Sequence, residues 1–413
     1  MIEQRDIVIA GGGMVGISLA LQLAACLPPE RRITLVEGFA LPPPGGRPDY
    51  HPSFDARSTA LSYSTRLVYE SIGIWPELSR WLCPIETIHV SNRGRFGSTL
   101  LRAADYDWPA LGYVVENAWL GNSLIQQLHR QQRVELLCPA KVIAAEPRSS
   151  GLDLTLEAEQ PRQINARLLV VADGAGSGLR EALGVSVAEK SYRQQALIAN
   201  VAFARPHEGC AFERFTDEGP LALLPLPGVT GAEHRSALVW TLPPAQAEQL
   251  QDCDDEEFLG ALQDRFGYRL GRLRQVGERH TYPLALTEST EQVRHSVVVM
   301  GNAAHALHPV AGQGYNLAMR DVAELARVLD EAIRAGEAPG SLSVLQRYRQ
   351  RQHNDQSRTI AMSDLLPGLF MNSDPVLGLA RDMALAGLDV MAPLKREFVR
   401  YAAGVAALGE THG

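Results

Sequence analysis

This chain of 413 residues has few cysteines, no excess of positive charge and no long apolar run. The five cysteines are widely spaced and odd in number, which argues against a disulfide framework and fits a reducing cytosol. The net charge of −8 leaves no basic surface for nucleic acid. No apolar stretch reaches the roughly 18–20 uncharged residues of a membrane-spanning helix, and a strand at the very start leaves no place for a signal peptide. We therefore expect a cytoplasmic protein that does not bind nucleic acid.

A metal-binding pattern is also missing. His305 and His308 are three positions apart, but no nearby cysteine or second cluster of histidine and carboxylate completes a site. We therefore predict no metal. Internal repeats are absent as well, and 413 residues with a hydrophobic content of 46% predict two to three globular domains with substantial cores.

The first 26 residues have the pattern of a strand, a glycine turn and a helix. An apolar run at residues 6–10 precedes the turn, and an apolar helix follows it to about residue 26. The first glycine permits the tight turn, the second lets backbone N–H groups approach a pyrophosphate, and the third lets helix and strand pack closely. The N-terminus of the helix then faces the phosphates with its partial positive charge. The residues that predict this dinucleotide site are Gly11, Gly12, Gly13, Met14 and Gly16.

A second apolar run, at residues 33–36, ends in the carboxylate of Glu37. An acid at this point can accept both hydroxyls of an adenosine ribose, which favours an unphosphorylated ribose, as in FAD or NAD. A plain NAD dehydrogenase is the weaker alternative, because it would not need the glycine-rich segment in the C-terminal half of the chain.

That segment contains a buried-strand run at residues 295–300, the turn Gly312, Gln313 and Gly314, and a helix predicted over residues 315–335. The two glycines allow backbone to lie against a flat ligand, and the helix N-terminus supplies unpaired N–H groups. A helix N-terminus aimed at the pyrimidine end of a flavin would stabilise the anion of its reduced form. Together with the N-terminal loop, this segment predicts a flavin. The alternative is an ordinary helix–strand connection with two turn glycines.

A third strand, at residues 166–172, ends in Asp173 and Gly174. An Asp-Gly pair after a strand is commonly a turn, but here it lies between two segments that are compatible with a nucleotide.

In combination, these motifs resemble the class A flavoprotein monooxygenases of the aromatic hydroxylase type, over residues 5 to about 400. The resemblance implies an α/β fold, with a Rossmann-like FAD-binding domain of the para-hydroxybenzoate hydroxylase type and an α+β substrate side built on an antiparallel sheet. It implies noncovalent FAD, with NAD(P)H as a co-substrate that binds transiently, because the sequence has no second dinucleotide loop. The cofactor-binding residues that it implies are Gly11, Gly13, Met14, Gly16, Glu37, Arg57, Asn117, Asp173, Gly174, Gly301, Asn302, Pro309, Gly312, Gln313, Gly314 and Asn316.

One position departs from the family pattern. The Gly-Asp motif that binds the flavin ribityl chain falls on Gly301 and Asn302. An amide keeps hydrogen-bonding capacity toward a ribityl hydroxyl but loses the charge, so FAD affinity can change while the site is kept.

Within the family, the chain most resembles the ubiquinone-biosynthesis branch that hydroxylates 2-polyprenyl-6-methoxyphenol. Three sequence segments carry this resemblance: Phe54-Asp-Ala-Arg-Ser-Thr-Ala-Leu, Phe212-Glu-Arg-Phe-Thr and His308-Pro-Val-Ala-Gly-Gln-Gly. It implies that NAD(P)H reduces FAD, O₂ gives a flavin C4a-hydroperoxide, and an oxygen atom passes to the phenol ring. Two alternatives stay open: an FAD-dependent prenyl reductase or epoxidase on the same fold, and a noncatalytic prenyl-binding escort.

Candidates for catalysis and substrate binding are less sharply marked. His305 could relay a proton, since histidine titrates near neutral pH, but a loop histidine bonded to backbone is the competing interpretation. Pro309 would line the flavin by the same resemblance. Aromatic and apolar strand residues are candidates for an apolar pocket, with a core position as the alternative: Phe212, Leu223, Pro225 and Trp240.

The motif positions predict a discontinuous FAD-binding domain at residues 1–80, 100–185 and 278–345. Residues 81–99 and 186–277 would form the substrate domain, and residues 346–413 a C-terminal helical segment. This last segment is rich in leucine and methionine, so it either caps the core or admits a polyprenyl tail at a membrane surface. The expected partners are thus a prenylated phenol and O₂, while peripheral attachment to the inner face of the membrane, a complex of ubiquinone-biosynthesis proteins and a homo-oligomer are open possibilities.

Overall fold

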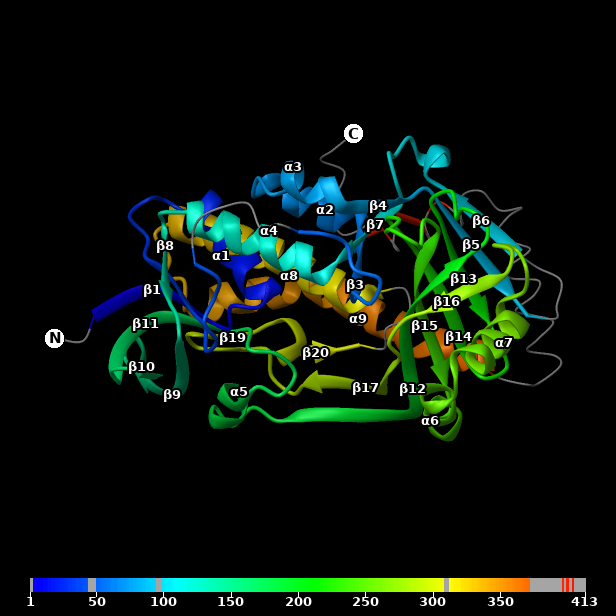
Figure 1. The fold of residues 1–413 in the computed structure, drawn as a ribbon. Helices are drawn as coiled ribbons and strands as arrows, with labels where there is room; N and C mark the ends of the chain where they lie inside the picture. Colours follow the sequence, from blue (N-terminus) through cyan, green and yellow to red (C-terminus); the bar gives the residue numbers. More distant parts are fainter. Residues whose placement is uncertain are drawn as a thin grey trace.

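The computed structural model describes residues 3–43, 50–93, 98–307 and 312–371, with residues 396, 399–400 and 403–404. These residues form three sheets and the helices that cover them. In Figure 1 the first sheet and its helices lie at one end of an elongated arrangement, and the large antiparallel sheet lies at the other. The predicted α/β class with an antiparallel substrate side is confirmed.

The first sheet has eight strands with a central parallel part in the order β19-β11-β1-β2-β8. Its inner strands are apolar throughout because helices and a β-meander cover both faces, as is usual for parallel sheets. The first glycine loop, Glu37 and Asp173 follow β1, β2 and β11 respectively, so all three lie at the carboxyl edge of the sheet. Its strands are β1 (Glu3–Ala10), β2 (Ile33–Val36), β8 (Val134–Leu137), β9 (Ala140–Arg148), β10 (Gly151–Ala158), β11 (Arg162–Val171), β18 (Val293–Arg294) and β19 (Val297–Val299).

Helix α8 (Gln313–Arg334) packs against α1 (Met14–Cys26) beside this sheet. It begins two residues earlier than the sequence pattern predicts, because Gly312 adopts φ 60° and serves as the N-cap. The other helices on this side are α2 (Tyr63–Ser71), α3 (Trp75–Leu78), α4 (Asn117–Arg130), α5 (Gly178–Ala182) and α9 (Leu342–Met371). Short 3₁₀ turns lie at η1 (Ser79–Trp81), η2 (Ala103–Tyr106) and η3 (Gly301–Ala303).

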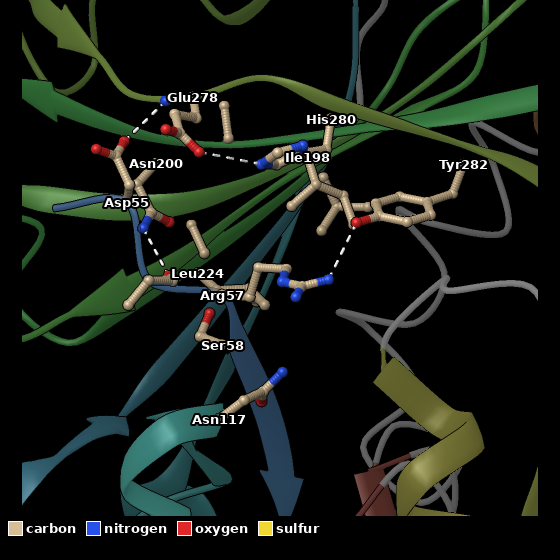
Figure 2. A pocket seen from close by; sticks show the side chains of 14 residues that line it. Asp55, Arg57, Ser58, Asn117, Ile198, Asn200, Leu224, Glu278, His280 and Tyr282 are labelled. Atoms are coloured by element: carbon tan, nitrogen blue, oxygen red, sulfur yellow. Dashed lines mark hydrogen bonds and ion pairs between the residues drawn. The ribbon is translucent and has the colours of Figure 1, made fainter. Parts of the chain in front are cut away.

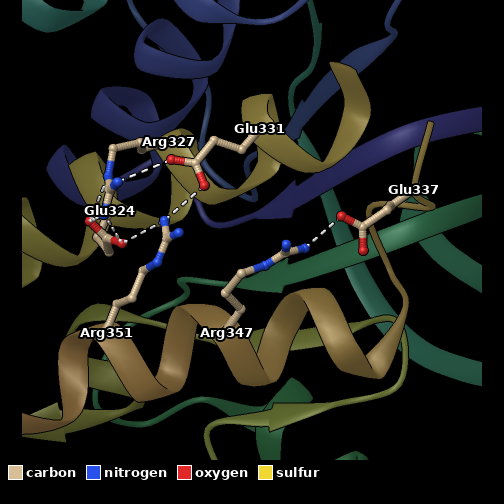
Figure 3. Close-up of polar contacts among 6 residues, drawn as sticks. All are labelled: Glu324, Arg327, Glu331, Glu337, Arg347 and Arg351. Carbon is tan, nitrogen blue, oxygen red and sulfur yellow. Dashed lines mark hydrogen bonds and ion pairs between the residues drawn. The ribbon is translucent and has the colours of Figure 1, made fainter. Parts of the chain in front are cut away.

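Exposed ion pairs join α8 and the segment that follows it to α9 (Figure 3). Arg351 contacts Glu331 at 2.9 Å and Glu324 at 3.6 Å, and Arg347 contacts Glu337 at 2.8 Å. Exposed pairs of this kind contribute about 0.2–1 kcal/mol each. Arg320 of α8 and Asp355 of α9 form a further pair at 2.6 Å, and this one is buried.

The second large sheet has nine strands in the order β20-β17-β12-β15-β14-β13-β5-β6, with β16 beside β12. We call it the substrate sheet. It is antiparallel except where β13 pairs with β5. Its strands are β5 (Thr87–Asn92), β6 (Ser98–Arg102), β12 (Val187–Phe203), β13 (Cys210–Phe215), β14 (Pro220–Leu226), β15 (Arg235–Leu242), β16 (Leu273–Val276), β17 (His280–Ser289) and β20 (His305–Ala306).

The two ends of the molecule are joined by a ribbon of two long strands. β12 and β17 pair with each other along most of their length and run from the substrate sheet toward the first sheet (Figure 1). β17 and β20 therefore belong to the substrate sheet, although their residues fall in the range predicted for the FAD-binding domain. The sequence-based boundary differs because a strand's partner depends on register with distant strands, which a local pattern does not contain.

One face of the substrate sheet carries α6 (Pro244–Asp252) and α7 (Asp255–Phe266), with an apolar cluster between them and the strands. α7 begins where the side chain of Asp254 caps its N-terminus, and it ends at Gly267, which has φ 87°. The opposite face looks toward a three-stranded sheet of β3 (Ser58–Ser62), β7 (Gly112–Glu116) and β4 (Leu82–Ile85).

None of the described helices is long and apolar enough to cross a membrane. In the part of the chain that the structure describes, no group of three or more His, Cys, Asp or Glu side chains is arranged to hold a metal ion. Most of the predicted C-terminal helical segment beyond residue 371, and Pro309 in the second glycine segment, lie outside the described residues.

Candidate functional site

The glycine turn after β1 is shaped by close backbone contacts. Gly11 has φ 111°, and a Cβ there would lie 2.5 Å from the carbonyl oxygen of Ala172. A Cβ on Gly16 would lie 1.9 Å from the carbonyl oxygen of Gly11. By contrast, a Cβ on Gly13 would meet no atom within 4 Å. Gly11 and Gly16 thus allow the strand and helix to pack, whereas Gly13 keeps backbone accessible to a ligand.

Helix α1 starts directly after this turn, with Met14 as its first residue and Gly13 as its N-cap. No side chain caps the helix and no acidic residue lies in its first turn, so its first backbone N–H groups remain available to an anion. The predicted pyrophosphate site therefore has the donors that it requires.

A cleft with a volume of about 810 Å³ opens in front of this helix end. Gly11, Gly13, Glu37, Asp173 and Gly174 all line it, so the structure brings together residues from three separate sequence motifs. The carboxylate of Glu37 accepts N–H groups from Gly12 and from Phe39, the latter at 2.8 Å. Since each carboxylate oxygen has a second lone pair, Glu37 can still accept a ribose hydroxyl.

Asp173 provides a test of whether the cleft suits a nucleotide. Its Oδ1 atom is buried and has no hydrogen-bond partner within the described part of the chain. A buried acceptor without a partner is costly, so such an atom is expected to bind a donor from a ligand or from water. The adjacent Gly174 adopts φ 94°, a backbone conformation that favours glycine. This chemistry fits a dinucleotide with hydroxyl groups near Asp173.

A second cavity, of about 270 Å³, lies beside Arg57 against the substrate sheet (Figure 2). Its lining comes from the loop before β3, from the start of α4 and from strands β12, β14, β15 and β17. The Nη1 atom of Arg57 donates to the hydroxyl of Tyr282 at 3.1 Å, and His280 lies 3.5 Å from the carboxylate of Glu278.

The loop that carries Arg57 is fixed at several points. The Nδ2 atom of Asn200 donates to the carbonyls of Phe54 and Ala56, at 2.6 and 2.8 Å. The carbonyl of Arg57 accepts the backbone N–H of Asn117 at 2.8 Å. Asp55 in turn accepts the N–H of Glu278 at 2.8 Å. These hydrogen bonds fix the loop at Phe54–Arg57 and so hold Arg57 at the boundary between the two ends of the molecule.

Beneath this loop lies a buried ion pair between Arg235 and Glu116. Arg235 is 0% exposed and Glu116 is 2% exposed, and their side chains are hydrogen-bonded. Arg235 also donates to the carbonyl of Ser53, and Tyr50 donates to Glu116. Burial, reinforced by the hydrogen bond to Glu116, raises the pKa of Tyr50 above its ordinary value. Removing one partner of a buried pair costs about 3–5 kcal/mol, so this network fixes the loop firmly.

The second glycine segment lies between β19 and α8. Gly301 has φ 61° and faces Val15 in α1, while Asn302 is exposed. Gly312, Gln313 and Gly314 form the N-terminal end of α8, where backbone N–H groups remain without helical partners. The positions of Gly301 and the α8 N-terminus suit a flavin, and the exposed amide of Asn302 is free to reach a ribityl hydroxyl.

Asn316 and Asn117 both make hydrogen bonds within the protein. The Oδ1 atom of Asn316 accepts from the N–H of Ser62 and from Thr65, and its Nδ2 atom donates to the carbonyls of Ala60 and Gly312. Asn316 is 2% exposed and joins α8 to β3. Asn117 lines the Arg57 cavity, and its Oδ1 accepts the hydroxyl of Thr59 at 2.6 Å. The structure thus gives Asn316 a clamping position, and Asn117 keeps its amide nitrogen for a ligand.

His305 is placed in the interior. It is 2% exposed, its Nδ1 lies 3.2 Å from Gln292, and its Nε2 lies 3.2 Å from Asp321 without the alignment of a hydrogen bond. These contacts lie between β20 and α8, away from the described lining of the Arg57 cavity. The ring of His305 thus contacts side chains and not the backbone, and its role as a proton relay stays a prediction.

The four substrate-binding candidates lie away from the Arg57 cavity. Phe212, Leu223 and Trp240 are buried against α6 and α7, where Phe212 meets Phe266 and Trp240 meets Phe258. Pro225 alternates with Leu224 along β14 and so shares the face of Leu223. Leu224 lines the cavity instead. Both faces of β14 are apolar, so the sequence did not reveal which face looked toward a ligand.

Comparison with known proteins extends these observations. Residues 130–362 match the family model described as "FAD binding domain". The chain is 36% identical to "Ubiquinone hydroxylase UbiL" of Rhodospirillum rubrum, over 98% of this chain and 90% of that protein. It is 32% identical to "3-demethoxyubiquinol 3-hydroxylase" of Escherichia coli, over 98% and 99% respectively. The crystal structure of p-nitrophenol 4-monooxygenase PnpA from Pseudomonas putida shares the fold, with a TM-score of 0.74 at 17% identity over 97% of this chain and 99% of that one.

Proposed function

Because this chain belongs to the class A flavin-dependent hydroxylases, whose FAD-binding domain it contains, we propose that it hydroxylates the ring of a polyprenylated phenol in ubiquinone biosynthesis, with NAD(P)H and O₂ as co-substrates. One observation carries the proposal. The nucleotide cleft lies at the carboxyl edge of the first sheet, and the start of α8 is hydrogen-bonded through Asn316 to β3, directly after the loop that lines the Arg57 cavity.

Residues of the chain supply the binding groups for FAD. The N-terminus of α1, Glu37 and Asp173 would hold the adenosine diphosphate part, and Arg57 would face the pyrophosphate or the ring beyond it. Gly301 with Asn302 and the N-terminus of α8 would hold the ribityl chain and flavin ring. FAD, when bound, supplies the reduction of O₂ and the transfer of one oxygen atom to the ring.

The protein's part is to orient the ring and exclude water. The fixed loop at Phe54–Arg57 gives the cavity a rigid wall, since Asn200, Glu278 and Asn117 each bond to its backbone or to Asp55. The facing strands contribute apolar side chains such as Ile198, Leu224 and Val239. A rigid, mostly apolar wall favours a defined position for an aromatic ring.

The class of substrate is supported by the relatives. Both are named for hydroxylation of ubiquinone or of a ubiquinol precursor, and both align over nearly the whole of this chain. The ring carbon that is hydroxylated depends on how the ring is turned in the cavity, and the prenyl length depends on where the tail leaves it.

We also propose that the protein is cytoplasmic and attaches peripherally to the inner face of the membrane. The support is chemical, because a polyprenyl tail resides in the bilayer and the enzyme must reach it. The leucine- and methionine-rich composition of residues 365–394 is compatible with such attachment. Co-sedimentation of the full chain with vesicles of neutral and anionic lipid would test it, and recovery of all protein in the supernatant with both would contradict it.

The first test of the function is an absorption spectrum of the purified protein, followed by identification of the flavin released on heating. We expect noncovalent FAD at about one per chain. The holoenzyme should then convert a prenylated methoxyphenol, with NAD(P)H and ¹⁸O₂, to a product that contains one ¹⁸O atom. FAD binding with reduced or epoxidised prenyl product would instead indicate a prenyl reductase or epoxidase, and protein unable to bind added FAD would indicate a noncatalytic escort.

A further inference from the structure

Glu213 is a carboxylate in an otherwise apolar strip of the substrate sheet. It lies on β13, inside the phrase Phe212-Glu-Arg-Phe-Thr, and its cross-strand partners are Ala222 on β14 and Val90 on β5. Ala222 pairs in turn with Val239, and Val239 with Ile198. Directly paired residues of a sheet point to the same face.

This row identifies the face on which Glu213 lies. Val239 and Ile198 line the cavity beside Arg57, as does Leu224 from the neighbouring row. Glu213 is therefore on the cavity side of the sheet, one strand beyond the strand of Leu224. With strands about 4.8 Å apart, its backbone lies roughly 10 Å from that of Val239. Phe212 and Arg214, on either side, point to the opposite face.

The strip is partly exposed. Ile198, Val239, Ala222, Glu213 and Val90 are all partly exposed, while the residues that alternate with them on β14, β15 and β5 are buried. A partly exposed apolar strip that continues from a cavity is the kind of surface on which an aromatic ring or its prenyl tail can lie.

The Glu213 carboxylate makes no hydrogen bond or ion pair within the described part of the chain, unlike the neighbouring Glu116 and Glu218. Burial raises its pKa to about 7, with no charged group contributing to the shift. A carboxylate in apolar surroundings without a partner destabilises the protein when ionised, and such groups are concentrated at functional sites.

We propose that Glu213 accepts a hydrogen bond from the ring hydroxyl of the phenol substrate and acts as the base that takes its proton. In this step the phenol O–H bond breaks, the proton passes to a Glu213 oxygen, and the electron pair stays on the phenolate oxygen. No electron is transferred to or from another molecule. The proposal rests on the proposed function, since it requires a phenol in the cavity.

The chemistry of the two groups is compatible with this role. A phenol has a pKa of about 10 and an ordinary glutamate about 4.3, a difference of nearly six units. The raised pKa of Glu213 reduces the difference to roughly three units. A phenolate ring is richer in electrons than the phenol, so proton transfer prepares it for attack by an electrophilic oxygen.

The test compares three variants of the holoenzyme. Glu213→Gln keeps the shape and can still accept a hydrogen bond, but it cannot take the proton. Glu213→Asp keeps the carboxyl group but withdraws it. Glu248→Gln, at an exposed position of α6 on the far side of the sheet, is the matched control. FAD content, NAD(P)H oxidation, hydroxylated product and the ultraviolet difference spectrum of bound phenol would be measured for each from pH 5.5 to 9, with a short-chain prenylated methoxyphenol.

We expect Glu213→Gln to keep FAD at the wild-type level and to lose hydroxylation by about 10²-fold or more, the usual contribution of a general base. The increase of kcat/KM through pH 7 and the phenolate band on binding should disappear, whereas Glu213→Asp should keep a weakened form of both. Glu248→Gln should match the wild type. A Glu213→Gln enzyme with wild-type product yield and pH profile would overturn the proposal.

These measurements distinguish a failure of the proposed function from a failure of the assignment of Glu213. If the wild-type holoenzyme binds the phenol without hydroxylating it, the proposed function fails, and the difference spectrum still reports whether Glu213 ionises the bound ring. If the wild type hydroxylates the phenol and Glu213→Gln does so equally well, the function stands and the assignment of Glu213 is wrong.

Discussion

The nucleotide cleft and the Arg57 cavity are built by different means. The cleft consists of backbone and short-range turns, with Gly11, Gly13, Glu37 and Asp173 each following directly after a strand of the first sheet. The cavity consists of side chains from a fixed loop and from four strands distant in sequence. The first kind of site is encoded locally and so survives in a motif, whereas the second depends on which face each strand turns toward the ligand.

The contrast extends to the ion pairs. Glu116 and Arg235 are nearly inaccessible and fix the loop at Arg57, whereas the pairs that Arg351 makes from α9 are partly exposed. Burial removes screening by water and makes the loss of one partner costly. Loss of one partner should therefore cost more stability at Glu116 and Arg235 than at Arg351.

The largest expected effect is that of Arg235→Leu. It leaves Glu116 without its partner in the interior, so we expect a loss of about 3–5 kcal/mol in the free energy of unfolding, with weaker retention of FAD. Denaturant unfolding of the apoprotein would measure it. The matched control, Arg351→Leu, breaks exposed pairs and should cost less than about 1 kcal/mol. Equal losses in the two variants would remove the distinction between the regions.

The next effect separates the two faces of β14. Leu223→Ala should cost about 2–5 kcal/mol, because Leu223 is 0% exposed in the cluster against α6 and α7. Leu224→Ala should cost less in stability, since Leu224 is partly exposed, but should change the KM for the phenol. Thermal unfolding and steady-state kinetics of both variants would check this. A change in KM for Leu223→Ala alone would place the ligand on the other face.

A smaller effect depends on pH. The pKa of Glu213 is raised from 4.5 to about 7 in the folded protein, so the folded state holds a proton that the unfolded state has released between these values. Its stabilising contribution is complete below pH 4.5 and is lost as the pH rises through about 7. Glu213→Gln should thus be more stable than the wild type at pH 8, by about 1–3 kcal/mol, and equal to it near pH 4.5.

Unfolding curves at pH 4.5, 6 and 8 would measure this difference, with Glu248→Gln as the control at an exposed position. A constant difference between wild type and Glu213→Gln at all three values would show that the carboxyl does not titrate as its burial requires.

The smallest expected change concerns Gly13. A Cβ there meets no atom within 4 Å and the residue has φ −71°, so Gly13→Ala should leave the stability of the apoprotein unchanged within about 0.5 kcal/mol. The added methyl group would intrude where the pyrophosphate approaches, and we expect about tenfold weaker FAD binding, or about 1.4 kcal/mol. Fluorescence titration with FAD would measure it. Unaltered affinity would place the pyrophosphate elsewhere in the cleft.

Much of the fold could be predicted from local patterns. The strand, turn and helix at residues 3–26, the acid at Glu37 and the helix α7 all follow from apolar periodicity and capping residues, which act within a few positions. The family resemblance rested on the same motifs. The pairing of β17 and β20 within the substrate sheet could not be predicted, because strand pairing between distant segments has no local signal.

The ligand-facing side of the substrate sheet shows most clearly what local sequence patterns could not predict. Their aromatic or large apolar side chains made Phe212, Leu223 and Trp240 candidates for the substrate pocket. The structure places all three in the core. Glu213, between Phe212 and Arg214, was quoted as part of a motif but assigned no role. The available signal was a charged residue next to the aromatic Phe212 on a strand, since neighbouring residues of a strand lie on opposite faces.

Glycine turns, helix ends and a strand-terminal acid are short-range features, so they already identify a dinucleotide-binding protein with the pattern of a flavin-dependent hydroxylase. Only the folded chain shows which residues face the substrate, that Asn316 joins α8 to β3, and that Glu213 has no partner among the described residues. These depend on burial and on strand register across the whole sheet, where a shift of one residue exchanges the two faces.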